Sequence, residues 1–244
     1  MKFAAETDRG LVREINEDSY NVIAGGADTP YAFIIADGMG GHNCGEIASR
    51  AAVEYISNSI AQDSRRFLPA EKCEAELRKL VEDTNSAVYQ KSLERPETNG
   101  MGTTLTMAVI VDTSIAVAHV GDSRLYLIRA GNIQQMTEDH SYIEALVKNG
   151  TITRKEAEHH PRKNIITRAV GCLPELEVDI LSLTVEKNDI FILCTDGLTN
   201  MLGEGEIAEK VRNSEPDVAC SQLIEAAKKQ GGEDNITVIV IKCE

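Results

Sequence analysis

The chain has 244 residues, with 25 Lys and Arg against 39 Asp and Glu, so its formal net charge at pH 7 is −14. With 42% hydrophobic and 26% charged residues, the composition is that of an ordinary globular domain. The acidic excess argues against the basic surface that binds nucleic acids or anionic lipids, so neither partner is expected.

The chain carries no sign of a membrane or secreted protein. No apolar run reaches the roughly 18 residues of a membrane helix, and acids stand where a signal peptide would need its apolar segment. The six cysteines are scattered and form no C-x-x-C pair, as is typical of thiols in a reducing compartment. We therefore expect a cytoplasmic protein without a disulfide framework or a zinc site.

Short β-branched runs predict strands, and apolar stripes at helical spacing predict helices between them. In chain order, we expect a strand at 31–36, helices at about 46–60 and 77–88, strands at 104–111, 115–120, 125–129 and 189–194, a helix at 220–227 and a strand at 236–241. Turns at 112–114 and 129–132 imply hairpins, and therefore antiparallel pairing. The fold class is thus α+β, with antiparallel sheet, expected as two sheets, covered by helices. The polar segment 148–171 is expected to lie on the surface.

Carboxylates stand at the ends of several predicted strands, each beside glycine. They occur in Asp37-Gly38, Gly121-Asp122, Asp196-Gly197 and Gly232-Glu233-Asp234, and a further acidic pair is Glu17-Asp18. Several such ends meeting at one edge would repel one another unless a cation neutralised them. Oxygen ligands favour the hard ions Mg²⁺ or Mn²⁺.

Each acid also has a simpler interpretation. Asp-Gly is a common turn pair, and Asp122 could form a local ion pair with Arg124. Asp234 could merely turn the chain into the last strand. The glycines that follow Asp37 do not match a dinucleotide-binding fingerprint, because Asn43 stands at the third glycine position, and the chain has no phosphate loop of the Walker type.

Taken in order, these motifs resemble the metal-dependent protein phosphatases of the protein phosphatase 2C family, in their compact bacterial form. The matching stretches are 7–13, 16–19, 36–42 with 45–46, 102–104, 119–124, 139–141, 195–198 and 234–237. The resemblance implies a central antiparallel β-sandwich flanked by helices, in α-β-β-α layers. It also implies one catalytic domain over 1–244, with a mobile flap at about 148–171.

The resemblance also implies roles for individual residues. Asp37 would bridge two metal ions, with the Gly38 carbonyl on one ion and Asp196 and Asp234 on the other. Glu17 and Asp18 would bind metal-bound waters. Asp122, with Asp196, would hold a third, weaker ion. Arg13 would bind the substrate phosphate, so the catalytic set is Arg13, Asp18, Asp37 and Asp196. The ions would be Mn²⁺ or Mg²⁺.

The expected activity is hydrolysis of phosphoserine and phosphothreonine in proteins, without a covalent intermediate and in opposition to a cytosolic Ser/Thr kinase. A monomer is expected. The alternatives are a regulatory phosphatase for one small phosphoprotein, a non-catalytic phosphoprotein-binding relative, and a phosphatase of small molecules. Met39 stands where animal members carry a histidine that protonates the leaving group, so the general acid stays open. His42 is expected to be structural, and His159 and His160 to be solvated.

Overall fold

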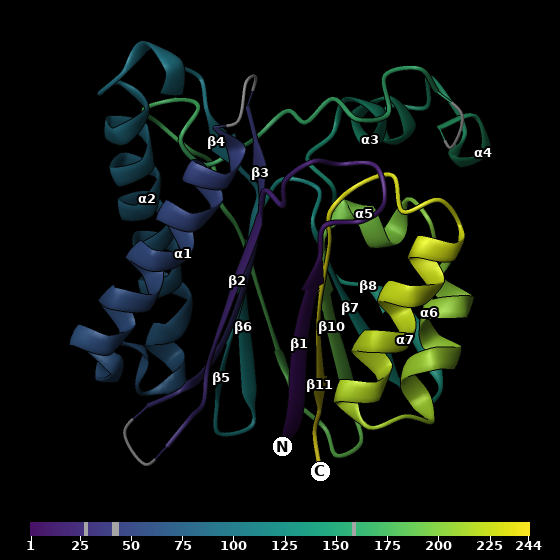
Figure 1. Ribbon diagram of the computed structural model, residues 1–244. Coiled ribbons are helices and arrows are strands. Elements are labelled where there is room, and N and C mark those ends of the chain that lie inside the picture. The colour runs from purple at the N-terminus through teal and green to yellow at the C-terminus, as the bar shows by residue number, and fades with distance from the viewer. Residues whose placement is uncertain (27–28, 41–43, 158–159) are drawn as a thin grey trace.

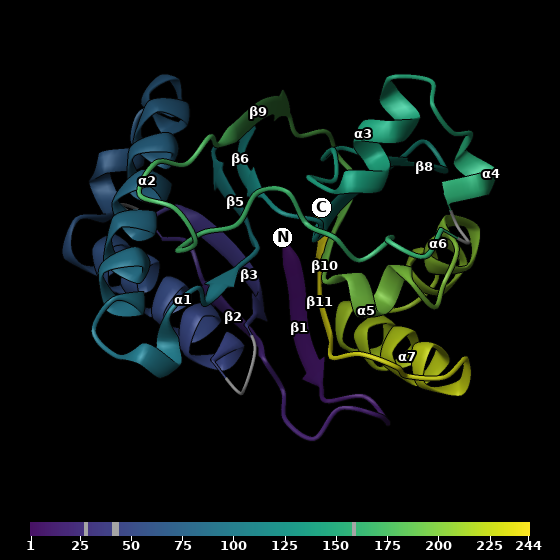
Figure 2. The same ribbon diagram turned by 90° about the horizontal axis from the view of Figure 1, so that it is seen from above.

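The computed structural model describes residues 1–26, 29–40, 44–157 and 160–244. Within them the chain forms two antiparallel sheets that face each other, with helices on both outer sides (Figures 1 and 2). One sheet has the strand order β1-β11-β10-β7-β8, and the other has the order β2-β3-β5-β6-β9, with the short β4 paired to β3. The predicted α+β sandwich in α-β-β-α layers is confirmed.

The elements follow one another along the chain as strands, helices and strands again. The strands are β1 Lys2–Asp8, β2 Asp18–Ile23, β3 Tyr31–Met39, β4 Gly102–Thr103, β5 Leu105–Val111, β6 Ser114–Val120, β7 Arg124–Arg129, β8 Asn132–Gln135, β9 Asp179–Thr184, β10 Ile190–Cys194 and β11 Ile236–Lys242. The helices are α1 Gly45–Gln62, α2 Cys73–Ser92, α3 Tyr142–Lys148, α4 Arg154–Ala157, α5 Asp196–Thr199, α6 Glu204–Arg212 and α7 Pro216–Lys229.

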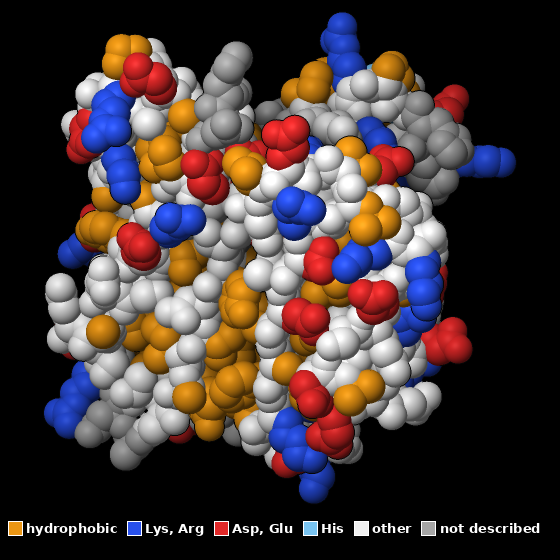
Figure 3. All heavy atoms as spheres, in the orientation of Figure 1, with side chains coloured by type: hydrophobic (Ala, Val, Ile, Leu, Met, Phe, Trp, Pro, Cys, Tyr) orange, Lys and Arg blue, Asp and Glu red, His pale blue; other side chains and the backbone are white. Residues whose placement is uncertain are grey.

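Central strands are buried on both faces because each lies between the other sheet and a helical layer. In β3, Phe33 and Ile35 belong to the core between the sheets, whereas Ile34 and Ala36 pack in the core shared with α1 and α2. α7 covers the opposite sheet through β1 and β11. Figure 3 shows hydrophobic side chains reaching the surface where the edge strands β1 and β2 adjoin.

The predicted turns form as expected. Asp112 and Ala130 adopt positive φ in the hairpins β5–β6 and β7–β8. After α7, Gly232 also adopts a positive φ and donates to the Ala227 carbonyl, as in a common helix ending. None of the described helices is long and apolar enough to cross a bilayer.

The segment 148–171 is exposed over most of its length but is anchored at its C-terminal end. Its part after α4 lies along the upper side of the molecule in Figure 1. Ile166 forms a bridge with Ser141, and the fully buried Val170 forms a bridge with Thr103. The prediction that this segment lies on the surface therefore holds only for its first part.

Candidate metal and phosphate site

Five carboxylates from both sheets converge at one end of the sandwich. Asp18 pairs with Asp37 across β2 and β3, so the two acids are neighbours in one sheet. Asp196 begins α5 just after β10 of the other sheet, close enough that its charge raises the pKa of Asp37. Asp122 follows β6, and Asp234 precedes β11. The turns that connect the strands at this end thus place acids from distant parts of the chain together.

Burial and mutual repulsion make these acids hard to ionise. Burial raises the pKa of Asp18 to about 7 and that of Asp122 to about 8, and the negative charge of Asp196 adds to both shifts. Burial and Asp234 raise the pKa of Asp196 to about 6. For Asp37, burial and its acidic neighbours raise the pKa well above its usual range. Such a cluster needs a cation to hold its ionised form.

Unpartnered oxygens show where a cation fits. Among the described residues, Asp18, Asp122 and Asp196 each have a buried Oδ1 atom without a hydrogen-bond partner. No group of three or more described His, Cys, Asp or Glu side chains forms a ready-made cage. Mg²⁺ keeps several of its waters and uses only one or two carboxylates. The oxygen-only, open donor set therefore fits a hydrated hard cation.

Asp37 is fixed through its backbone by two threonines. Its N–H donates to Thr104 Oγ1 over 2.9 Å, and its carbonyl accepts from the Thr104 N–H over 2.8 Å and from Thr103 Oγ1 over 2.9 Å. The next residue, Gly38, lies against α1, where a Cβ atom would stand 2.1 Å from the Gly45 carbonyl oxygen. Only glycine permits this close approach of strand and helix.

The position of Asp18 is fixed by hydroxyls from the other sheet. Its Oδ2 accepts from Thr195 Oγ1 over 2.9 Å and from Thr237 Oγ1 over 2.6 Å. Sequence inspection did not identify either threonine. The only sequence signal is that Thr195 directly precedes Asp196 and that Thr237 follows Asp234 by three residues.

Arg13 lies at the rim of the acidic cluster. Its Nη2 donates to Asp234 Oδ2 over 2.7 Å, and its side chain is 48% exposed. Partial burial opposes its charge, but Asp234, Glu17 and Asp37 outweigh this effect and raise its pKa. The guanidinium thus stays charged and can bind a phosphate beside the acids.

The N-terminal loop that carries Arg13 and Glu17 is bound to Asn235. The Asn235 side chain accepts from the Glu17 N–H over 2.8 Å and donates to the carbonyls of Arg9 and Ile15, each over 2.9 Å. Burial and Glu46 raise the pKa of Glu17, which places it at the edge of the same acidic field. Asn235 is a further site residue without a role assigned from sequence.

Arg124 pairs with Asp139, over 2.6 Å, in a two-pronged contact. The hypothesis of a local ion pair between Arg124 and Asp122 is therefore wrong, because the strand directs the guanidinium toward the loop after β8. Beside Asp122 and Asp196 opens a cavity of about 830 Å³, also lined by Ser141, Arg154, Lys163 and Asn164. The site is thus continuous with the 148–171 segment.

Two of the histidines discussed above, His42 and His159, lie outside the described residues, as does Gly41. His160 accepts from the Arg162 N–H at the surface.

Comparison with known proteins agrees with this geometry. Residues 12–230 match the family model described as protein phosphatase 2C. The serine/threonine phosphatase stp of Listeria monocytogenes is 39% identical over 237 residues, covering 97% of this chain and 93% of that protein. The serine/threonine phosphatase Stp1 from Staphylococcus aureus, known from a crystal structure, shares 32% sequence identity with this chain. The two structures superpose with a TM-score of 0.94, over 99% of this chain and 94% of that one.

A further solved structure bears on the metal. The catalytic domain of the serine threonine protein phosphatase PstP, in complex with two manganese ions, is 34% identical, with a TM-score of 0.86 and coverage of 100% and 98% of the two chains. The family match, the high identity over nearly the full length and the common fold lead to one conclusion: the chain belongs to the protein phosphatase 2C family.

Proposed function

We propose that this phosphoprotein phosphatase hydrolyses phosphoserine and phosphothreonine with two divalent ions at the acidic cluster and a third, weaker ion at Asp122. The observation that carries the assignment is the set of buried, unpartnered oxygens of Asp18, Asp122 and Asp196 next to a charged Arg13. When bound, such ions neutralise phosphate oxygens and make water a nucleophile at neutral pH.

The roles proposed for the single residues are those that the family resemblance implies. Asp37, on which the charges of the other four acids act, would be shared by two ions, and the Gly38 carbonyl would join it as a ligand. Asp196 and Asp234, from the opposite sheet, would complete the ligands of the second ion. Asp196 and Asp122 together would bind the third ion. Asp18 and Glu17 would hold the waters of the ions. All ligands are oxygens, which suits Mn²⁺ or Mg²⁺.

Arg13 would bind the substrate phosphate at the rim. Its exposed guanidinium offers several N–H donors in one plane, which matches two oxygens of a phosphate. Asp234 orients it from one side, so a substrate needs to meet only the free part of the fork. The catalytic set under this proposal is Arg13, Asp18, Asp37 and Asp196.

The wider setting belongs to the same proposal. Residues 1–244 act as one catalytic domain, and the flap at 148–171 borders the 830 Å³ cavity. The protein works as a monomer in the cytoplasm and opposes a Ser/Thr kinase. The relatives named as serine/threonine phosphatases support the substrate class.

Release of phosphate from a phosphothreonine peptide tests this function. We expect release with Mn²⁺, none with EDTA, and nearly none from Asp196→Asn. The matched control is Asp217→Asn on the exposed side of α7, which should keep full activity. A folded wild-type protein that binds the peptide but releases no phosphate with any divalent ion would instead be a non-catalytic phosphoprotein-binding protein.

A panel of unrelated phosphopeptides separates the broad enzyme from a regulatory phosphatase dedicated to one phosphoprotein. Comparable turnover across the panel would favour the broad enzyme. The role of the third ion is tested by Asp122→Ala, which should retain two tightly bound ions and show reduced turnover. Full turnover in this variant would remove Asp122 from the reaction.

A further inference from the structure

We propose that His140 is a positioning residue that fixes the turn carrying Asp122 and couples it to the base of the 148–171 segment. This role rests on the proposed function of Asp122 as an ion ligand. His140 lies between the end of β8 and α3, and its side chain is only 6% exposed. Its side chain forms hydrogen bonds to Gly121 and Asp179 and none to Asp122.

The first half of the coupling joins His140 to the turn. The Gly121 N–H donates to His140 Nδ1 over 3.1 Å, and the His140 N–H donates to the Gly121 carbonyl over 2.7 Å. Gly121 has φ +108°, and a Cβ there would lie 2.6 Å from Thr104 side-chain atoms. The turn is thus confined between His140 and the Thr104 that also binds Asp37.

The second half joins His140 to the 148–171 segment. Its carbonyl accepts from the Thr167 N–H over 2.7 Å, and its Nε2 lies 3.1 Å from Asp179 Oδ2. Asp179 Oδ1 in turn accepts from Arg168 Nη1 over 2.9 Å. Arg168 Nη1 also lies 3.2 Å from His140 Nε2, so Arg168 contacts both the imidazole and the Asp179 carboxylate.

These contacts require one tautomer of His140. Because Nδ1 accepts the Gly121 N–H, the ring proton stands on Nε2 and donates to Asp179. The protonated Nε2 has no lone pair for Arg168, so its 3.2 Å approach to Arg168 Nη1 is a packing contact. Asp179 thus orients the ring, and the ring presents its acceptor to the turn. Exchange of the two nitrogens would break both contacts at once.

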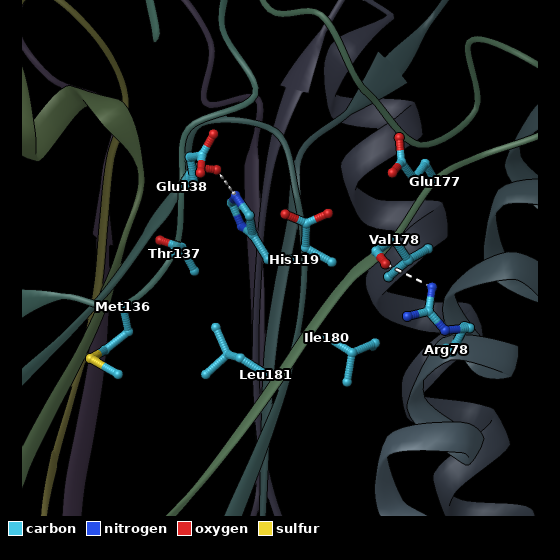
Figure 4. A pocket seen from close by; sticks show the side chains of 10 residues that line it. Arg78, His119, Met136, Thr137, Glu138, Glu177, Val178, Ile180 and Leu181 are labelled. Carbon is cyan, nitrogen blue, oxygen red and sulfur yellow. Dashed lines mark hydrogen bonds between the residues drawn. The ribbon is translucent and has the colours of Figure 1, made fainter. Parts of the chain in front are cut away.

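A second histidine supports the ring from behind. His119 lies 4.8 Å from His140 between ring centroids, and burial together with His140 lowers its pKa to about 4. Its Nε2 donates to the Glu138 carbonyl over 3.0 Å, the contact drawn in Figure 4, and its Nδ1 accepts from Thr106 Oγ1 over 2.9 Å. A neutral, fully hydrogen-bonded His119 makes a rigid support, since it has no free polar atom to reorient.

The consequence concerns Asp122, whose Oδ1 has no partner among the described residues. No contact of that oxygen fixes the carboxylate, so its direction depends on the backbone of the turn. Removal of a group that orients a metal ligand without contacting the metal commonly lowers metal affinity by about 10–100-fold. His140 should therefore act on ion binding at Asp122 rather than on peptide binding.

The test compares two substitutions, each of which places a polar group near only one of the two imidazole nitrogens. His140→Asn places an amide oxygen near the position of Nδ1, whereas His140→Gln reaches toward Nε2 and lacks that acceptor. Binding of Mn²⁺, followed by the electron paramagnetic resonance signal of free Mn²⁺, should show the weakest ion bound at least about tenfold more weakly in His140→Gln. His140→Asn should recover most of this affinity, and both should keep the wild-type KM for a phosphopeptide.

The control is the same pair in an Asp122→Ala background. If His140 acts through Asp122, His140→Gln adds no further loss of Mn²⁺ binding there. An equal loss with and without Asp122, equal behaviour of the Asn and Gln variants, or unchanged Mn²⁺ binding would each overturn the proposal. The Mn²⁺-binding measurements do not depend on catalytic turnover. A lack of phosphatase activity would therefore count only against the proposed function.

A second variant covers the case in which His140→Gln does not fold. Asp179→Ala removes the group that orients the ring, at a side chain that is 44% exposed. We expect weaker Mn²⁺ binding and faster amide hydrogen exchange at residues 166–170. Wild-type values of both would overturn the coupling.

Discussion

At the scale of single residues, Arg13 joins one observed partner, Asp234, to the phosphate proposed as its second. Its contact with Asp234 is exposed enough that it adds little to stability, because surface ion pairs contribute at most about 1 kcal/mol. Its value lies in orientation, since it directs a fixed positive charge toward the acidic cluster. Under the proposed function, a phosphate bound there would contact this guanidinium as well as the metal ions.

Arg13→Ala should raise KM for a phosphopeptide about tenfold, since a hydrogen bond to a charged group contributes roughly 1.5–3 kcal/mol. It should change kcat far less, because binding of the phosphate precedes the reaction. Steady-state kinetics over a range of peptide concentrations measure both. Arg13→Lys should fall between, and Arg50→Ala, on the exposed side of α1, should match wild type. An unchanged KM in Arg13→Ala would remove Arg13 from the phosphate site.

At the scale of elements, the N-terminal loop depends on one side chain from the far end of the chain. Asn235 makes hydrogen bonds to the backbone of Arg9, Ile15 and Glu17, so it fixes the loop without contacting Arg13. Asn235→Ala should lower the free energy of unfolding by about 1 kcal/mol, since it removes three hydrogen bonds between a buried side chain and half-buried backbone groups. Urea denaturation measures this loss, and Gln222→Ala on the exposed side of α7 is the control. A loss no larger than that of the control would contradict the role of Asn235.

The junction between β3 and α1 depends on Gly38. A methyl group there would collide with the Gly45 backbone, and backbone cannot rotate away as a side chain would. Gly38→Ala should therefore cost at least about 1–3 kcal/mol and weaken Mn²⁺ binding. Gly205→Ala in α6 is the matched control, because nothing lies within 4 Å of its Cβ and it should stabilise the protein by about 0.4–1 kcal/mol. Thermal denaturation compares the two, and equal melting temperatures would refute the collision.

At the scale of the whole molecule, the sequence predicted the inside of the sandwich better than its edges. The six predicted strands correspond to β3, β5, β6, β7, β10 and β11. The strands without a prediction include β1, β8, β2 and β9, which are the four edges of the two sheets. Edge strands are half exposed and mix polar with apolar residues, so they lack the continuous apolar run that identifies a buried strand.

The site divides in the same way. Asp37, Asp122 and Asp196 could be chosen from the sequence because each lies at the end of an apolar strand and adjoins glycine. The groups that orient them could not, since Thr237, Asn235 and His140 gain their roles only from neighbours far away in the chain. Such contacts depend on how strands from the two sheets come together. The hydrophobic periodicity of a single strand does not predict this arrangement.

The acidic cluster also makes the stability of the whole protein depend on pH and metal. In the metal-free protein, burial raises the pKa values of Asp18 to about 7 and of Asp122 to about 8, above the ordinary value of 3.8. The folded state then holds more protons than the unfolded state, so stability falls as pH rises through these values. His119, with its pKa lowered to about 4, has the opposite sign, but its contribution is complete above its ordinary value of 6.5.

Between pH 6.5 and about 8, the carboxyl groups of Asp18 and Asp122 therefore determine how the free energy of unfolding changes with pH. In EDTA, the melting temperature should fall across this interval, by roughly 2–4 °C for each kcal/mol lost. Mn²⁺ should raise the melting temperature, and more at pH 8 than at pH 6.5, because it binds the ionised carboxylates. Asp18→Asn should flatten the slope in EDTA, whereas Asp217→Asn should not. A melting temperature that rises with pH in EDTA over this interval would show that the cluster is not strained without its ions.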